Sequence, residues 1–279
     1  MTGSFKKVAV IGWPISHSLS PTIHNHWMKQ KGIEGVYEKV AVGPDAIETA
    51  ISRFKKEGYS GFNVTVPHKE AIMPFLDKIA PLARQMGAVN TVKIGGDGTT
   101  TGFNTDGIGL VTNLKKNVPD WPKDKPVLIL GAGGAARAAA LGLLTEDVPF
   151  VMITNRTRAK AEAITNDVGR GRMTVVDWDH RMDAVAAAGV IVNTTVLGMK
   201  GQPALEMDLT SAAKDTVVYD IVYQPLMTPL LKDAEKLGLR TVTGLGMLVY
   251  QAAASFKIWF GEDVDYDDAL RQVLEAGFQ

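Results

Sequence analysis

The chain has 279 residues, and 46% of them are hydrophobic, so it is long enough to bury the core of one large or two medium domains. Thirty basic residues balance thirty acidic ones, which excludes binding to nucleic acid or an anionic membrane through a strong overall charge. The absence of cysteine excludes disulfides, thiolate metal sites and a cysteine nucleophile.

Short β-branched runs alternate with amphipathic stretches, a pattern typical of an α/β protein with a mainly parallel sheet. In the first half we expect strands at residues 8–11, 36–42, 61–66 and 89–94, and helices at 21–31, 46–57 and 77–86. Ser20 stands where the first helix would have its N-cap. The first apolar run is too short for a signal peptide and no window resembles a membrane span, so we expect a cytoplasmic protein.

The segment 118–126 is rich in proline and charge, and it precedes a second α/β series. We expect strands at 127–130, 150–153, 190–193, 217–221 and 241–243, and final helices at 247–260 and 265–275. A domain boundary is predicted in or just before the helix 107–117. The prediction is therefore two domains, residues 1–105 completed by 246–279, and residues 106–245.

A glycine-rich turn follows the strand 127–130 and opens a helix. It matches the pattern G-x-G-x-x-A with Gly131, Ala132, Gly133, Gly134, Ala135 and Ala136. Glycines at these positions let backbone N–H groups approach a pyrophosphate, which then lies at the positive end of the helix. A turn built for packing has a similar string, but the strand and helix around it favour a Rossmann-type dinucleotide-binding domain.

The next strand of this series is followed by Asn155-Arg156-Thr157-Arg158. NAD-binding proteins commonly place an acidic residue here for the ribose 2′-hydroxyl, whereas this chain has two arginines. Guanidinium groups bind phosphate oxygens in a bidentate fork, so the loop favours NADP, with Lys160 as a further cationic contact. The alternative is a solvated helix start with Thr157 as its N-cap.

Polar residues also follow the strands of the first half. Strand alternation puts Asn63 and Thr65 on one face, and Lys69 comes just past the strand end. Ser18 and Ser20 are two apart in an extended stretch and can face the same way. An ordinary solvent face explains these positions as well, and the hydroxyl of Ser20 is also suited to capping the helix.

Other candidate residues are ambiguous when taken alone. Asp106 begins a helix, where a carboxylate cap is common, and Met247 and Gln251 share a helix face. Asn90 and Tyr223 carry no signal by themselves. Four histidines, His17, His24, His26 and His68, cluster early in the chain but lack ligand spacing of a known type, so we predict no metal site.

Taken together, these segments resemble the shikimate dehydrogenase family along nearly the entire chain. The matching motifs are Ile11-Gly12-x-Pro14-x-x-His17-Ser18-x-Ser20-Pro21-x-x-His24-Asn25, Asn63-Val64-Thr65-Val66-Pro67-His68-Lys69, Gly87-Ala88-Val89-Asn90-Thr91, Gly102-x-Asn104-Thr105-Asp106-Gly107, the glycine-rich turn 131–136, Asn155-Arg156-Thr157, Tyr223-x-Pro225 and Gly246-Met247-x-x-x-Gln251. The Tyr223-Gln224-Pro225 segment departs from the commoner Tyr-Asn-Pro at a position that is not a usual ligand.

The resemblance implies an enzyme that uses NADPH to reduce 3-dehydroshikimate to shikimate, reversibly, in chorismate and aromatic amino acid biosynthesis. It implies a substrate domain at 1–105 with 246–279 and an NADP domain at 106–245. The implied catalytic pair is Lys69 and Asp106. The implied substrate ligands are Ser18, Ser20, Asn63, Thr65, Asn90, Tyr223 and Gln251. The implied NADP-binding residues are Gly131, Ala132, Gly133, Gly134, Ala135, Asn155, Arg156, Thr157, Arg158, Lys160, Thr194, Gly244 and Met247.

Two alternatives share most of these motifs. One is a quinate/shikimate dehydrogenase that works oxidatively with NAD or NADP, beside a relative that acts on aminated shikimate analogues. The other is a non-catalytic dinucleotide sensor with the same fold. Arg156 favours NADP, and the presence of both Lys69 and Asp106 argues against a sensor. We expect a monomer or homodimer with a small-molecule substrate and neither a nucleic-acid nor a membrane partner.

Overall fold

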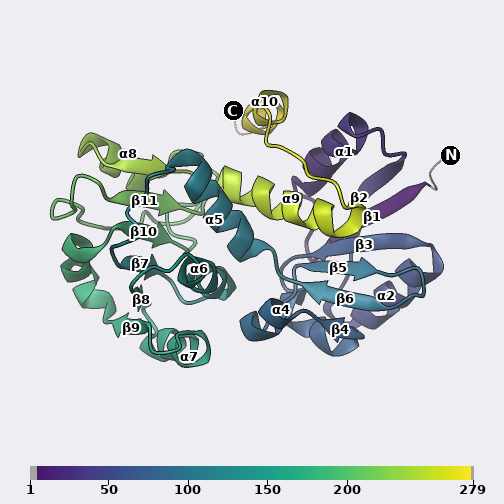
Figure 1. The fold of residues 1–279 in the computed structure, drawn as a ribbon, viewed down its shortest axis with the longest axis horizontal. Coiled ribbons are helices and arrows are strands. Elements are labelled where there is room, and N and C mark those ends of the chain that lie inside the picture. Colours follow the sequence, from purple (N-terminus) through teal and green to yellow (C-terminus); the bar gives the residue numbers. More distant parts are fainter. Residues whose placement is uncertain (1–4, 278–279) are drawn as a thin grey trace. The chain divides into compact units, whose positions relative to one another are not determined.

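The computed structural model describes residues 5–277. The chain divides into two compact units, shown as a ribbon in Figure 1. The first unit takes the residues up to Thr105 together with Ala252–Gly277, and the second takes Asp106–Gln251. Of the helices in the described part of the chain, none has the length and hydrophobicity needed to cross a membrane.

The first unit has a six-stranded sheet with the order β2-β1-β3-β5-β6-β4, which the labels follow down Figure 1. Its strands are β1 (Lys6–Gly12), β2 (Gly35–Ala41), β3 (Tyr59–Val64), β4 (Lys78–Ile79), β5 (Thr91–Ile94) and β6 (Thr100–Phe103). Strand β5 runs antiparallel to β3 and β6, and the other pairings are parallel. Its helices are α1 (Ser20–Gln30), α2 (Ile47–Lys56), α3 (His68–Ala71), α4 (Pro81–Met86), the end of α9 (Leu245–Phe260) and α10 (Asp268–Ala276).

The second unit has a six-stranded sheet in which every pairing is parallel. Its strands are β7 (Val127–Leu130), β8 (Val151–Thr154), β9 (Met173–Val176), β10 (Val190–Asn193), β11 (Val217–Asp220) and β12 (Arg240–Val242). The order β9-β8-β7-β10-β11-β12 is that of a doubly wound dinucleotide-binding fold, in which the direction of winding reverses between β7 and β10. The helices are α5 (Asp106–Asn117), α6 (Gly134–Leu144), α7 (Arg158–Val168), α8 (Pro229–Lys236) and the start of α9.

Both cores follow from the apolar strands. In the first unit Ile11, Phe62 and Val64 pack with Phe54 of α2. In the second unit all residues of β7, β8, β10 and β11 are buried, which explains why these strands read as continuous apolar runs rather than alternating ones. The prediction of a two-domain α/β protein with mainly parallel sheets is confirmed.

The predicted helix at 77–86 is wrong in its first part. The Asp77 carboxylate accepts hydrogen bonds from the backbone N–H of Thr100 at 2.8 Å and from its hydroxyl at 2.7 Å. These contacts hold residues 78 and 79 as a strand beside β6, and the helix begins only at Pro81. The elements α3, β6, β9 and α8 were not predicted, and the first three have no continuous apolar run like those that mark β7 and β10.

Candidate functional site

Polar residues gather at the carboxyl ends of two adjacent parallel strands, β1 and β3. The backbone N–H of Thr65 donates to the Ile11 carbonyl at 3.0 Å, and that of Trp13 donates to the Val66 carbonyl at 3.1 Å. A Cβ on Gly12 would lie 2.6 Å from a methyl carbon of Thr65, so glycine is required for this close approach. The segments that lead to Ser18 and Lys69 therefore leave the sheet side by side.

The hydroxyl of Ser18, rather than that of Ser20, contacts the start of α1. Leu19 is the N-cap, and the backbone N–H of Ser20 donates to the Ser18 Oγ at 3.3 Å. The prediction that Ser20 caps the helix is wrong, because Ser20 is already the first helical residue. A hydroxyl that accepts a hydrogen bond still has its own proton to donate, so Ser18 keeps a donor for a ligand.

Asn63 is buried, and both ends of its amide contact other protein groups. Its oxygen accepts from the Tyr37 hydroxyl at 2.7 Å, and its two N–H groups are shared among three acceptors at 3.0 to 3.1 Å, namely the Asn90 carbonyl, the Thr91 hydroxyl and the Ser255 hydroxyl. These contacts favour a role in holding β3, β5 and the end of α9 together. The contact of Asn63 with substrate stays a prediction.

Asn90 and Lys69 lie close to Thr65 through the backbone. The N–H of Val64 donates to the Asn90 carbonyl at 2.8 Å, and that of Val89 donates to the Lys69 carbonyl at 2.8 Å. The Asn90 side-chain oxygen accepts from the backbone N–H of Thr105 at 2.9 Å, which fixes the orientation of its amide. The first unit therefore brings the predicted residues Thr65, Lys69 and Asn90 to one edge of its sheet.

His24 is fully buried among aromatic rings in the same unit. Its ring stacks on Tyr37 with centroids 4.3 Å apart and lies edge-on to Trp27 at 5.7 Å. Burial lowers the pKa of His24 to about 3, and neither ring nitrogen has a hydrogen-bond partner among the residues that the structure describes. His24 is therefore a neutral core residue at physiological pH.

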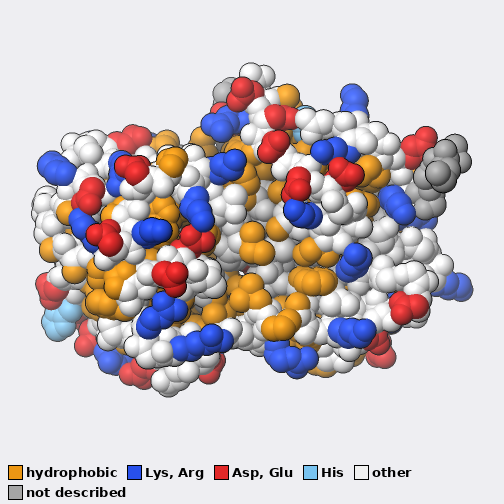
Figure 2. Space-filling model, in the orientation of Figure 1, with side chains coloured by type: hydrophobic (Ala, Val, Ile, Leu, Met, Phe, Trp, Pro, Cys, Tyr) orange, Lys and Arg blue, Asp and Glu red, His pale blue; other side chains and the backbone are white. Residues whose placement is uncertain are grey.

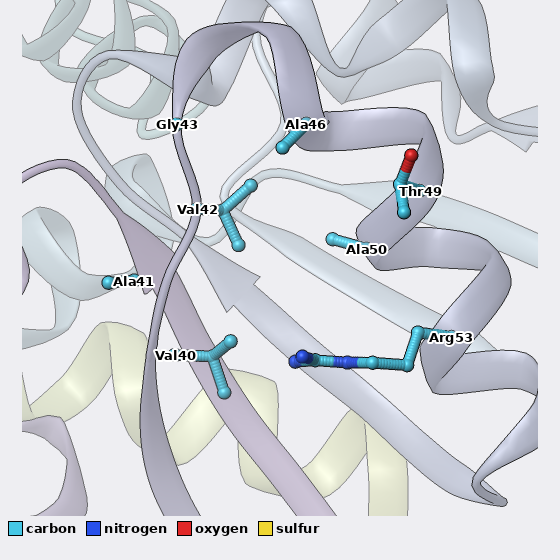
Figure 3. Close-up of a pocket in the computed structure, with 8 residues that line it drawn as sticks. All are labelled: Val40, Ala41, Val42, Gly43, Ala46, Thr49, Ala50 and Arg53. Atoms are coloured by element: carbon cyan, nitrogen blue, oxygen red, sulfur yellow. The ribbon is translucent and has the colours of Figure 1, made fainter.

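A small pocket in the first unit lies between the end of β2 and helix α2 (Figure 3). Its volume is about 140 Å³, less than the roughly 300–1,000 Å³ typical of ligand pockets. Val42 and Ala50 point into it, and the guanidinium of Arg53 lies over the Phe54 ring at 5.2 Å. Its lining includes none of the predicted ligands: Val40, Ala41, Val42, Gly43, Ala46, Thr49, Ala50 and Arg53.

In the second unit, the glycine-rich turn lies where the winding of the sheet reverses. Gly131 has a φ of 109°, and a Cβ on it would lie 2.7 Å from the Thr194 hydroxyl, which itself donates to the Leu130 carbonyl at 2.7 Å. A Cβ on Gly133 or Gly134 would meet open space. Within the described chain no side chain caps the N-terminus of α6, so this turn fits an incoming pyrophosphate.

The three cations after β8 differ in their surroundings. Arg158 pairs with Asp177 and also donates to Glu162 at 2.8 Å, and these two carboxylates raise its pKa. Arg156 and Lys160 are exposed, and neither forms a side-chain hydrogen bond or ion pair with the residues that the structure describes. The face shown in Figure 2 has basic and acidic side chains interspersed. A phosphate group therefore has to be bound by a few neighbouring cations, such as Arg156 and Lys160, rather than by a broad basic surface.

The predicted residues of α9 are set by a close approach to α5. A Cβ on Gly109 would lie 2.7 Å from both the Met247 carbonyl and the Gln251 Cβ. A Cβ on Gly246 would overlap the side-chain oxygen of Asn113 at 1.9 Å. Gly244 meets a similar restriction, since its Cβ would lie 2.1 Å from the Ile221 carbonyl.

Three family models match the chain. The shikimate dehydrogenase substrate-binding domain matches residues 10–92, the shikimate/quinate 5-dehydrogenase model matches 113–221, and the shikimate 5′-dehydrogenase C-terminal domain matches 244–274. A shikimate dehydrogenase (NADP⁺) of Paramagnetospirillum magneticum is 46% identical over 97% of this chain and 98% of that protein. The chain belongs to the shikimate dehydrogenase family.

Solved structures of family members have the same fold. A crystal structure of a shikimate dehydrogenase in complex with NADP⁺ has a TM-score of 0.90 and 38% identity, and the match covers 99% of this chain and 96% of that one. Quinate dehydrogenase from Corynebacterium glutamicum in complex with NAD also has a TM-score of 0.90, with 33% identity over 98% and 99% of the two chains. The fold is thus shared by enzymes with different substrates and cofactors.

Two buried polar residues in the second unit were not predicted. Asn193 and Asp220 are the last residues of β10 and β11, and they are direct partners in the register of the sheet. The sequence does carry a signal for this pair, because each of two apolar strands ends in a polar residue. Parallel strands bring their carboxyl ends to one edge of the sheet, so these two residues are expected to lie close together.

Proposed function

We propose that this chain is an NADP-dependent shikimate dehydrogenase, which reduces the ring ketone of 3-dehydroshikimate to shikimate and catalyses the reverse reaction, in the biosynthesis of aromatic amino acids. The observation that carries this proposal is the similarity over 97% of the chain to a shikimate dehydrogenase (NADP⁺). The presence of Lys69 and Asp106 supports a catalytic protein rather than a sensor.

We assign substrate binding to residues 1–105 with 246–279, and cofactor binding to residues 106–245. The strand order of the second unit supports the cofactor assignment, because it is the order of dinucleotide-binding domains. The polar edge of the first sheet, with Thr65, Lys69 and Asn90, supports the substrate assignment.

The bound cofactor would supply a hydride from its nicotinamide ring. Transfer to a ketone builds negative charge on the oxygen, which needs a positioned donor that also delivers a proton. In our proposal the Lys69 ammonium donates that proton, and the Asp106 carboxylate orients the ammonium and compensates its charge. In the reverse direction the Lys69 amine takes the proton from the hydroxyl of shikimate.

The other predicted residues would bind the rest of the substrate. We assign the carboxylate to the hydroxyls of Ser18, Ser20, Thr65 and Tyr223, and the ring hydroxyls to Asn90 and Gln251. Several short donors on strand and helix ends can fix a small polyol without a metal ion. The donor that Ser18 retains beside α1 supports this assignment.

For NADP we assign the pyrophosphate to the turn 131–135 with Thr194, and the nicotinamide side to Gly244 and Met247. The adenosine 2′-phosphate would lie on Arg156 and Lys160, with Asn155 and Thr157 beside them. Arg158 remains a predicted ligand from the sequence, but its two carboxylate partners make it the weakest of the three cations for this task. The exposed side chains of Arg156 and Lys160 support NADP over NAD.

Incubation of the protein with NADPH and 3-dehydroshikimate tests the proposed function. We expect the NADPH absorbance to fall and shikimate to form in equal amount, as identified by mass spectrometry. Binding of NADPH without turnover would support the dinucleotide sensor. In the oxidative direction, faster oxidation of quinate than of shikimate would support the quinate dehydrogenase.

A further inference from the structure

A buried carboxyl group in the second unit has no part in the proposed chemistry. Asp220, the last residue of β11, is fully buried. Its Oδ1 accepts hydrogen bonds from the Asn193 side-chain amide at 2.9 Å and from the backbone N–H of Val222 at 3.0 Å. Its Oδ2 accepts from the Thr228 hydroxyl at 2.7 Å. The carboxyl group thus receives three hydrogen bonds from three segments of chain.

One of these partners holds the turn after β10. The side-chain oxygen of Asn193 accepts from the backbone N–H and the hydroxyl of Thr195 at 2.9 and 2.8 Å, and its amide also donates to the Leu197 carbonyl at 3.1 Å. Thr194, which we assign to the cofactor site, is the first residue of this turn. The backbone N–H of Thr194 donates to the Leu130 carbonyl at 2.8 Å, so the turn is tied to the strand that precedes the glycine-rich loop.

The other two partners enclose the segment that carries Tyr223. Val222 directly precedes Tyr223, and Thr228 is the N-cap of α8. One carboxyl group therefore fixes this segment at both ends. The N–H of Lys200 donates to the Gln224 carbonyl at 2.8 Å, which joins the segment to the turn after β10 at a second point.

We propose that Asp220 is a positioning residue that couples the turn carrying Thr194, on the cofactor side, to the segment carrying Tyr223, on the substrate side. This inference rests on the proposed function for the roles of Thr194 and Tyr223. Removing the carboxyl group would leave three donors unpaired in a buried place, and the two turns would lose their shared anchor.

The geometry indicates which replacement preserves the anchor. In Asp220→Asn, the amide oxygen can accept from Asn193 and Val222 as Oδ1 does, and the amide nitrogen can donate to the Thr228 hydroxyl, which is able to accept. In Asp220→Ala, all three partners lose their acceptor. Thr228→Val removes the hydrogen bond to Asp220 on the Tyr223 side, together with the cap hydrogen bond from the Leu231 N–H, and Thr228→Ser retains the hydroxyl for both as its matched control.

The test compares the KM values for shikimate and NADP, kcat, and the Kd of NADP from fluorescence titration in these four variants. For Asp220→Ala we expect both KM values and the Kd to rise about tenfold, the change that corresponds to ~1.4 kcal/mol. For Asp220→Asn we expect all of them to stay within about threefold of wild type. Thr228→Val should raise the KM for shikimate and leave the Kd of NADP unchanged, and Thr228→Ser should resemble wild type.

A double-mutant cycle with Tyr223→Phe separates positioning from a general loss of stability. If Asp220 acts through the Tyr223 hydroxyl, the effect of Asp220→Ala on the KM for shikimate shrinks to about threefold in the Tyr223→Phe background. Additive effects, unchanged KM and Kd values in Asp220→Ala, or an equal loss in Asp220→Asn would overturn the proposal. If Asp220→Ala does not fold, the comparison of Thr228→Val with Thr228→Ser tests the proposal instead. Failure of the wild-type protein to turn over shikimate would overturn the proposed function instead, and the Kd of NADP would still report the cofactor side of the coupling.

Discussion

The guanidinium of Arg158 pairs with the Asp177 carboxylate, whereas Arg156, two residues earlier, forms no side-chain ion pair with the residues that the structure describes. The two arginines are thus inequivalent although the sequence gives them the same charge. Asp177 precedes the 3₁₀ helix Trp178–Ala187, so this contact joins the start of α7 to the chain after β9.

The first prediction follows from that difference. Arg156→Ala should weaken NADP binding by about tenfold or more, because a charge-assisted hydrogen bond to phosphate is lost, and should change NAD binding little. Arg158→Ala is the matched control and should affect NADP much less, since its charge is already paired. Titration of both variants with both cofactors measures this. Equal losses of NADP affinity in the two variants would show that Arg158 leaves Asp177 to bind the phosphate.

The second prediction concerns the substrate carboxylate. Ser18→Ala should raise the KM for shikimate by an amount equivalent to about 1.5–3 kcal/mol, the value of a hydrogen bond to a charged group. The control is Ser16→Ala, an exposed serine of the same segment, which should leave KM unchanged. Steady-state kinetics of the wild type and the two variants measures the KM values for shikimate and NADP. A shift in the KM for NADP alone would contradict the assignment of this edge to the substrate.

The third prediction concerns acid stability. The unfolded chain protonates His24 near pH 6.5, and burial lowers the folded-state pKa to about 3. As the pH falls from about 6.5 toward 3, only the unfolded chain takes up the proton, so His24 lowers the stability of the fold by about 1.4 kcal/mol per pH unit. Urea unfolding between pH 7 and about pH 5 should show a flatter pH dependence for His24→Phe, which keeps an aromatic ring. If the free energy of unfolding depends on pH in the same way in the wild type and in His24→Phe, His24 is not the neutral buried group described above.

The fourth prediction concerns the contact between α5 and α9. Gly109→Ala places a methyl group 2.7 Å from the Met247 carbonyl and the Gln251 Cβ, so one helix has to shift. We expect a loss of about 1–3 kcal/mol in the free energy of unfolding, together with a lower kcat/KM. Lys116→Ala, an exposed change on the same helix, is the control. Wild-type stability and activity in Gly109→Ala would exclude a role for this contact.

Much of the fold was predictable because its signals are local. The buried strands β7 and β10 match their predicted bounds, since runs of four and three consecutive apolar residues between turns define them. The segment 77–86 was not predictable in the same way. Its first residues form a strand because Asp77 binds Thr100, a contact between residues 23 apart that no local pattern shows.

The residues of the candidate site differ in the same way, since some stand in local motifs and others depend on distant contacts. The glycine-rich turn and the polar residues at 63–69 stand in short motifs that the sequence displays directly. The network of Asp220, Asn193 and Thr228 joins three segments up to 35 residues apart, and each residue alone resembles an ordinary strand end or helix cap. The ion pair of Arg158 could not be predicted either, because its partner Asp177 follows β9, a strand that was not predicted from the sequence.

The fifth prediction concerns the proton donor. Lys69→Ala should lower kcat by about two to four orders of magnitude, the usual range for a lost acid/base group, with a smaller change in substrate affinity. Asp106→Asn should also impair turnover, and the double variant should be far from additive because the two groups act together. A near-normal kcat in Lys69→Ala would remove Lys69 from the mechanism.

The most direct test of the central claim is kcat/KM for shikimate and quinate, each with NADP and with NAD, in the wild-type protein at fixed ionic strength. We predict that kcat/KM for shikimate with NADP far exceeds the values for the other three combinations, and that Arg156→Asp lowers the ratio of NADP to NAD use. Quinate oxidation with NAD at a comparable or greater rate would contradict it.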